Sequence, residues 1–155
     1  MNVPMLDLKA QYASIKNEIR QAVDEVLESQ HFILGPSVAK LEEEIAAYSH
    51  CRYALGVSSG TDAILLALMG LGVGQGDTVI TTTFTFFATA GAVSRLGAIP
   101  VFVDIDPITY NLDLNMVESI LKQDNSIRAI IPVHIFGLPV DMNRLMNLAE
   151  EYNLI

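Results

Sequence analysis

The first part of the chain has the hydrophobic periodicity of helices. Over residues 9–29, apolar side chains recur every three or four positions, which places them on one face of an amphipathic helix. They are Ile15, Ile19, Val23, Val26 and Leu27. A Gly-Pro pair then interrupts the pattern, and a second apolar stripe predicts another helix from Ser37 to about residue 48. We therefore expect a helical segment over residues 1–50.

From residue 51 onward, short apolar runs alternate with helical patterns. The apolar runs predict strands at residues 53–57, 78–81, 99–103 and 127–133. Between and after them, helices are predicted at residues 61–71, 86–96, 115–122 and 141–152. Apolar strands separated by helices are typical of a parallel sheet that is covered on both faces. We therefore predict a three-layer α/β/α fold over residues 51–155, in which the last three residues begin a further strand.

Composition narrows the class of protein. The chain has 155 residues, of which 51% are hydrophobic, and this content indicates a globular protein rather than a disordered one. It carries 18 acidic against 9 basic residues, so no basic surface for nucleic acid is expected. Cys51 has no partner for a disulfide, and no apolar run is long enough to cross a membrane. We expect a cytoplasmic protein without nucleic-acid or membrane partners.

A candidate anion site lies where the predicted strand at 53–57 leads into the next helix. The first amides of a helix lack intrahelical acceptors and lie at the positive end of the helix dipole, so they bind anions. Gly60 would let an anion approach the backbone, and the hydroxyls of Ser59 and Thr61 can add hydrogen bonds. Alternatively, Ser59 or Thr61 only caps the helix. The residues themselves leave both interpretations open.

The same segment also matches the G-x-S-x-G pattern of serine hydrolases, with Ser58 as the nucleophile. Asp104 or Asp106, and then His134, follow in the order that this class requires. No HGGG-like segment for an oxyanion hole precedes Ser58, however. A serine hydrolase is therefore a second hypothesis.

Two more candidates follow predicted strands, at the sheet edge where open parallel sheets bind ligands. Phe86 comes after the strand at 78–81, and its ring can either stack on a flat ligand or pack in the core. His134 comes after the strand at 127–133. The histidines and Cys51 do not have the spacing of metal ligands, so no metal site is expected.

Taken in order, several segments resemble the DegT/StrS family of sugar aminotransferases. They are DLKAQYASIKNEI (7–19), HFILGPSVAKLEEEIAAY (31–48), SSGTDAILLAL (58–68), GDTVITTTFTFFATAGAV (76–93), PVFVDIDPITYNLD (100–113) and PVHIFGLPVDM (132–142). The resemblance implies a pyridoxal 5'-phosphate enzyme with the aspartate-aminotransferase type of fold (fold type I). Residues 1–155 would then be the N-terminal portion of its large domain, with the rest of that domain and the small C-terminal domain absent.

The resemblance also implies roles for individual residues. Gly60 and Thr61 would bind the cofactor phosphate, with Ser59 as a further candidate beside them, and Phe86 would stack on the pyridine ring. Phe32 matches an aromatic position that approaches the nucleotide-sugar substrate in some relatives, and His134 lies in a characteristic segment of the family. Phe32 and His134 are therefore candidates for substrate binding.

By resemblance, the activity is transamination of a nucleotide-linked keto sugar, with glutamate as the amino donor, by a homodimer. The Schiff-base lysine and the carboxylate that pairs with the pyridinium would both lie beyond residue 155. The lysines that are present lie outside the cofactor motifs; they are Lys9, Lys16, Lys40 and Lys122. We therefore expect this chain to hold no catalytic residue and to be inactive alone. The alternatives are a sugar dehydratase of the same family, in which histidine replaces the lysine, and a non-catalytic remnant.

Overall fold

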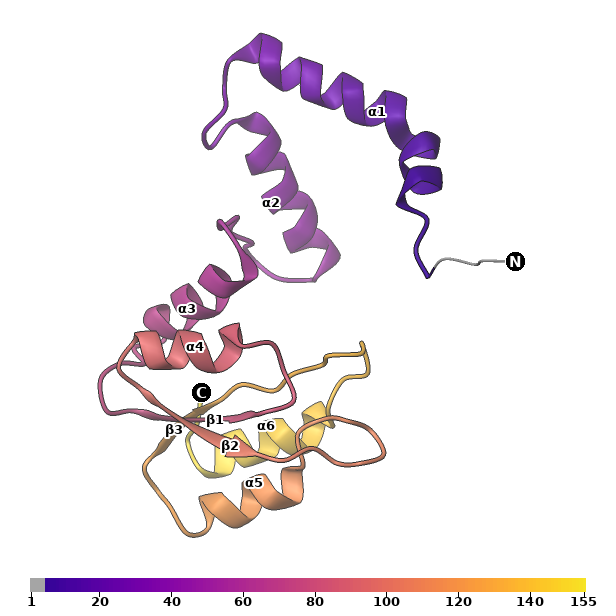
Figure 1. The fold of residues 1–155 in the computed structure, drawn as a ribbon. Coiled ribbons are helices and arrows are strands. Elements are labelled where there is room, and N and C mark those ends of the chain that lie inside the picture. Colours follow the sequence, from indigo (N-terminus) through magenta and orange to yellow (C-terminus); the bar gives the residue numbers. More distant parts are fainter. Residues whose placement is uncertain (1–4) are drawn as a thin grey trace. The chain divides into compact units, whose positions relative to one another are not determined.

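The computed structural model describes residues 5–155, which form two compact units, 5–56 and Val57–Ile155 (Figure 1). The boundary lies close to residue 50, where the predicted helical segment ends.

The N-terminal unit consists of the two predicted helices, α1 (Leu8–Ser29) and α2 (Pro36–Tyr48). The carboxylate of Asp7 caps α1 by accepting a hydrogen bond of 2.9 Å from the amide of Ala10. Pro36 occupies the first turn of α2, where the missing amide hydrogen would have had no intrahelical acceptor. Neither helix contains a buried residue, so the apolar stripe of α1 stays partly exposed.

Residues 53–57 do not form the predicted strand, so this prediction was wrong. A strand requires a neighbouring strand with which to exchange backbone hydrogen bonds. None of the strands within residues 5–155 pairs with this segment, and the side chain of Leu55 is 78% exposed. The backbone is held instead by a side chain, because the amide of Gly56 donates to Glu42 Oε1 at 2.7 Å. The apolar run indicated that these residues tend to be buried, but it did not show whether a neighbouring strand would pair with them.

The C-terminal unit is built on a parallel sheet in the order β2-β1-β3. Its strands are β1 (Thr78–Thr82), β2 (Ile99–Val103) and β3 (Ile127–Ile130). The predicted parallel arrangement is confirmed, although β3 ends before residue 133. Ile155 extends the sheet beyond β3: its amide donates to the carbonyl of Arg128 at 3.1 Å, and its carbonyl accepts from Ile130 at 2.8 Å. The expected start of a further strand therefore lies beside β3.

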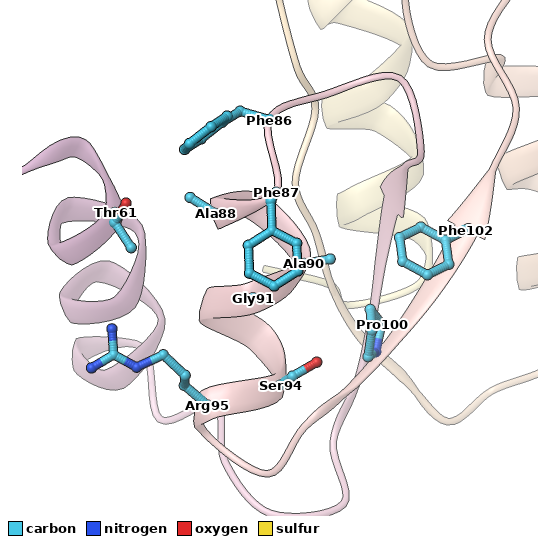
Figure 2. A pocket seen from close by; sticks show the side chains of 10 residues that line it. All are labelled: Thr61, Phe86, Phe87, Ala88, Ala90, Gly91, Ser94, Arg95, Pro100 and Phe102. Carbon is cyan, nitrogen blue, oxygen red and sulfur yellow. The ribbon is translucent and has the colours of Figure 1, made fainter.

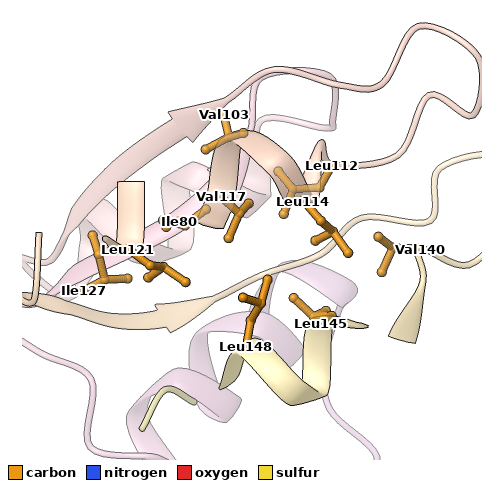
Figure 3. Close-up of a cluster of buried hydrophobic side chains, with 10 residues drawn as sticks. All are labelled: Ile80, Val103, Leu112, Leu114, Val117, Leu121, Ile127, Val140, Leu145 and Leu148. Atoms are coloured by element: carbon orange, nitrogen blue, oxygen red, sulfur yellow. The ribbon is translucent and has the colours of Figure 1, made fainter. Parts of the chain in front are cut away.

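Helices cover both faces of this sheet, which confirms the three-layer α/β/α prediction (Figure 1). They are α3 (Gly60–Gly70) and α4 (Ala88–Arg95) on one face, and α5 (Leu114–Leu121) and α6 (Met142–Glu151) on the other. Successive strand residues point to opposite faces. Val79 accordingly packs with Leu68 and Val93 under α3 and α4, whereas Ile80 belongs to the core between the sheet, α5 and α6 (Figure 3).

Candidate functional site

The N-terminus of α3 provides two free backbone donors. Ser59 is the N-cap: its hydroxyl accepts a hydrogen bond from the amide of Asp62 at 3.1 Å, and its carbonyl accepts from Ala63 at 2.9 Å. The amides of Gly60 and Thr61 find no acceptor within residues 5–155. Because the positive end of the helix dipole lies at the same point, these two amides are a candidate anion site in an acidic chain.

The space in front of these amides is open. A Cβ atom added at Gly60 would meet no heavy atom within 4 Å, so this position is unobstructed for an anion. The structure also shows that Ser59 is the helix cap, which was one of the two interpretations of this residue. Since Ser59 accepts from Asp62, its own hydroxyl hydrogen remains available to donate. Capping and anion binding are therefore compatible at Ser59.

The serine-hydrolase pattern lacks the geometry of a catalytic triad. The hydroxyl of Ser58 bonds to the carboxylate of Asp62, and no histidine in the described chain bonds to it. His134 uses Nδ1 to accept a hydrogen bond from the amide of Val140 at 3.2 Å. Ser58 is also not in the left-handed backbone region, and no strand precedes it within residues 5–57. Ser58 therefore has neither a histidine base nor the strained turn that activates such a nucleophile.

Phe86 lies in the loop of residues 83–87, which connects β1 to α4. Its side chain is 75% exposed, so it does not pack in the core. The loop is anchored at both ends by buried threonines. Thr82 Oγ1 accepts from the amide of Phe84 at 3.1 Å, and the hydroxyls of Thr85 and Thr89 lie 3.0 Å apart. An exposed ring on an anchored loop is suited to contact a ligand.

Thr61 and Phe86 line the same cavity, which has a volume of about 750 Å³ (Figure 2). The remaining lining comes from α4, the residue before it and the edge strand β2: Phe87, Ala88, Ala90, Gly91, Ser94, Arg95, Pro100 and Phe102. The structure thus brings two predicted cofactor residues, from segments far apart in the sequence, to one cavity. The contributions of Phe87 and Phe102 were not predicted, because their positions on separate segments give no local signal.

The two predicted substrate residues belong to other segments of the chain. His134 follows β3 at the carboxyl edge of the sheet and is exposed, but it does not line this cavity. Phe32 belongs to the N-terminal unit, in the connection between α1 and α2, and its side chain is 57% exposed. Their roles in substrate binding stay predictions.

Residues 5–155 contain no group of three or more histidine, cysteine, aspartate or glutamate side chains placed to hold a metal ion. Across the same residues, no helix combines the length and the apolar character that spanning a membrane requires.

The sequence model of the DegT/DnrJ/EryC1/StrS aminotransferase family matches residues 13–155. The chain therefore belongs to this family of aminotransferases. It is 52% identical to the pleiotropic regulatory protein of Geobacillus stearothermophilus, covering 100% of this chain and 41% of that protein. It is 44% identical to the UDP-N-acetyl-3-dehydro-alpha-D-glucosamine 3-aminotransferase of Acidithiobacillus ferrooxidans, over 98% of this chain and 41% of the relative.

The fold and the cofactor agree with this membership. The crystal structure of NtdA from Bacillus subtilis with bound cofactor PMP has a TM-score of 0.92 and 34% sequence identity, covering 99% of this chain and 35% of that one. Pyridoxal 5'-phosphate is the cofactor of the family. The chain spans about two fifths of the length of the relatives that it matches.

Proposed function

We propose that this chain is the part of a sugar transaminase that binds the phosphate and one ring face of pyridoxal 5'-phosphate. The full-length enzyme would transfer an amino group, with glutamate as donor, to a keto sugar linked to a nucleotide. The observation that carries this proposal is that Thr61, in the first turn of α3 beside Gly60, and the exposed ring of Phe86 line one cavity. The names of the relatives support the substrate class.

The residues of the site fit the cofactor. Its phosphate is an anion, and in a chain of net charge −9 the donors offered at this point are backbone amides and hydroxyls rather than lysines. Gly60 and Thr61 would supply the amides, and the hydroxyls of Ser59 and Thr61 would add donors. Phe86 would cover one face of the pyridine ring, since aromatic side chains favour offset stacking on flat rings.

When bound, the cofactor supplies a carbonyl that condenses with amines and a pyridinium ring that accepts the electron pair released from the substrate carbon. This chain would hold that group in place. Helix-terminal amides fix the phosphate, and the ring of Phe86 shields one face from water. Both contacts would orient the cofactor without moving a proton.

We propose that the 155-residue chain alone does not transaminate. A lysine amine must bond to the cofactor and later carry a proton. Lys122 lies at the end of α5, on the sheet face opposite to α3 and α4, where Glu118 Oε1 binds its Nζ at 2.6 Å. Lys40 pairs with Glu44 at 3.8 Å on α2, and Lys9 and Lys16 lie on α1. Lys122 does not line the α3–α4 cavity, and Lys9, Lys16 and Lys40 belong to the N-terminal unit.

Two substitutions at one position test the phosphate site. Gly60 is the first residue of α3, where proline is tolerated, and Ser59 before it is extended, as proline requires. Gly60→Pro therefore removes one amide donor while keeping the helix, whereas Gly60→Ala keeps the donor and adds a Cβ in open space. A charge-assisted hydrogen bond is worth roughly 1.5–3 kcal/mol. We expect Gly60→Pro to weaken cofactor binding by about tenfold or more, and Gly60→Ala to weaken it less, because its amide donor remains.

Equilibrium dialysis with pyridoxal 5'-phosphate, and separately with inorganic phosphate, measures these affinities. Phe86→Leu should weaken binding of the cofactor but not of phosphate, because only the cofactor has a ring. Equal affinity of the Gly60→Pro variant and the unaltered chain would overturn the phosphate assignment. Borohydride reduction followed by mass spectrometry should find no lysine adduct, and a stoichiometric adduct at one lysine would contradict the proposed inactivity.

We propose further that the enzyme works in the cytoplasm as a homodimer, as the family resemblance implies. Light scattering after size-exclusion chromatography of the full-length protein measures the assembly. A monomeric active enzyme would refute this part of the proposal.

A further inference from the structure

Three aromatic rings meet at the carboxyl edge of the sheet, outside the cavity. The ring centroids of Phe84 and Tyr110 are 5.9 Å apart, and Phe136 lies 6.0 Å from each of them. These separations and the tilted or edge-on orientations are those of favourable aromatic pairs. The rings belong to neither hydrophobic core, and Phe136 is still 69% exposed. Burial in a hydrophobic core therefore does not explain why these rings are in contact.

Each ring comes from a different loop. Phe84 follows β1, Tyr110 follows β2, and Phe136 follows β3. The strands are parallel, so all three loops leave the sheet at the same edge (Figure 1). The aromatic cluster thus connects, through side chains, three loops that follow three different strands.

Tyr110 is presented by a rigid turn. Ile105 and Leu112 form an antiparallel bridge, and within it the carbonyl of Asp106 accepts from the amide of Tyr110 at 2.9 Å. Tyr110 has φ of 60°, a left-handed conformation that non-glycine residues seldom adopt. The carboxylate of Asp106 accepts from the amide and hydroxyl of Thr109, at 2.8 and 3.0 Å, and these bonds lower the pKa of Asp106. The turn is held by its own hydrogen bonds, so Tyr110 is a fixed support.

Phe84 connects this support to the cofactor site. It lies two positions before Phe86 in the loop of residues 83–87. The ends of that loop are anchored by the hydrogen bonds of Thr82 and of the Thr85–Thr89 pair. Phe86 itself is mostly exposed, so its position depends on the backbone that carries it. Holding the ring of Phe84 restrains the middle of that loop.

We propose that the cluster of Phe84, Tyr110 and Phe136 positions Phe86 for contact with the cofactor ring. Tyr110 and Phe136 are positioning residues, because they act through Phe84 and the loop rather than by touching the cofactor. The inference rests on the proposed function, because it explains the ordered loop by the contact of Phe86 with the cofactor. It adds two loops, β2–α5 and β3–α6, to the machinery that shapes the cofactor site.

The test uses the 155-residue chain and two readouts. Hydrogen exchange of the amides of residues 84–89 reports the order of the loop without cofactor, and equilibrium dialysis reports the affinity for pyridoxal 5'-phosphate. Tyr110→Ala should speed hydrogen exchange in this loop and lower the affinity for the cofactor about tenfold, because two aromatic contacts are lost. Tyr110→Phe keeps the ring and should restore both readouts. Ile108→Ala is the matched control, because Ile108 lies in the same turn, is 84% exposed and has no ring.

The outcomes separate the two proposals. If the unaltered chain does not bind the cofactor, the proposed function fails, while hydrogen exchange still decides whether Tyr110 orders the loop. If the chain binds the cofactor but Tyr110→Ala leaves exchange and affinity unchanged, the positioning role is refuted and the proposed function stands. Should Tyr110→Ala unfold the turn, Phe136→Leu removes a ring from another loop, and the same faster exchange at 84–89 is expected. Unchanged exchange in that variant would likewise refute the positioning role.

Discussion

The amide of Asp62 donates a hydrogen bond of 3.1 Å to the hydroxyl of Ser59, and this bond begins α3. It satisfies one of the amides at the helix N-terminus and leaves those of Gly60 and Thr61 without an acceptor in residues 5–155. The turn that stabilises the helix is therefore also the turn that offers donors to an anion. Substitutions here affect folding and binding together, and they have to be designed to separate the two effects.

Ser59→Ala should lower the free energy of unfolding by about 1 kcal/mol, because the cap is lost. Ser59→Asp should keep the cap and much of the stability, since aspartate is a good N-cap residue. It also places a negative charge beside the anion site, so cofactor affinity should fall. Urea unfolding and equilibrium dialysis measure the two effects. A cofactor affinity that Ser59→Asp leaves intact would contradict the location of the phosphate.

Leu121→Ala should destabilise the C-terminal unit by about 3 kcal/mol, because it leaves a cavity in the core beneath α5. Leu121 is 1% exposed, whereas Met116 on the same helix is 45% exposed. Met116→Ala is the matched control and should cost less than about 0.5 kcal/mol. Urea unfolding followed by circular dichroism compares them, and equal losses would show that α5 does not pack as described.

Gly97→Ala should cost roughly 1–2 kcal/mol for two reasons. Gly97 follows the end of α4 with φ of 74°, and an added Cβ would clash with the side chain of Gln75. Gly70→Ala is the control: no atom lies within 4 Å of its added Cβ, its backbone is helical, and alanine favours helix. We expect Gly70→Ala to be neutral or stabilising. A loss of stability at Gly70 equal to that at Gly97 would be inconsistent with this geometry.

Acid should weaken the contact between α5 and α6 at Glu118. Hydrogen bonds from Lys122 and Arg144 lower the pKa of this carboxyl. Arg144, on α6, reaches Glu118 Oε2 at 2.9 Å. Because the pKa is lowered in the folded state, the stabilisation is complete above the ordinary glutamate pKa of about 4.3. It is lost as the pH falls from there through the lowered folded value.

Carbon NMR of the Glu118 carboxyl during acid titration measures this folded pKa directly. Glu118→Gln should remove the corresponding part of the pH dependence of unfolding. Glu150→Gln on α6 is the control, since Glu150 forms no ion pair within the described residues. A midpoint for Glu118 at or above the ordinary value would rule out the ion pairs.

Local patterns were sufficient for much of the fold. The stripe of Ile15, Ile19 and Val23 predicted α1, and the apolar run at residues 99–103 predicted β2 with its correct bounds. The helix start at Gly60 and its cap at Ser59 were also predictable, because a glycine and a cap residue at a helix start are a local signal. The apolar run at residues 53–57 led to a wrong prediction. Its pattern is a local property, but a strand forms only when a partner strand elsewhere in the chain pairs with it.

Periodicity and ordered motifs are properties of neighbouring residues, so they were enough to predict the helices, the parallel three-layer arrangement and the family. The position of Phe86 outside the core, in a cavity shared with Thr61, follows only from the three-dimensional packing of the chain. It alone brought Phe84, Tyr110 and Phe136 together from three loops. Parallel strands end at one edge of the sheet, and this places residues distant along the chain side by side, where no local pattern can record their contact.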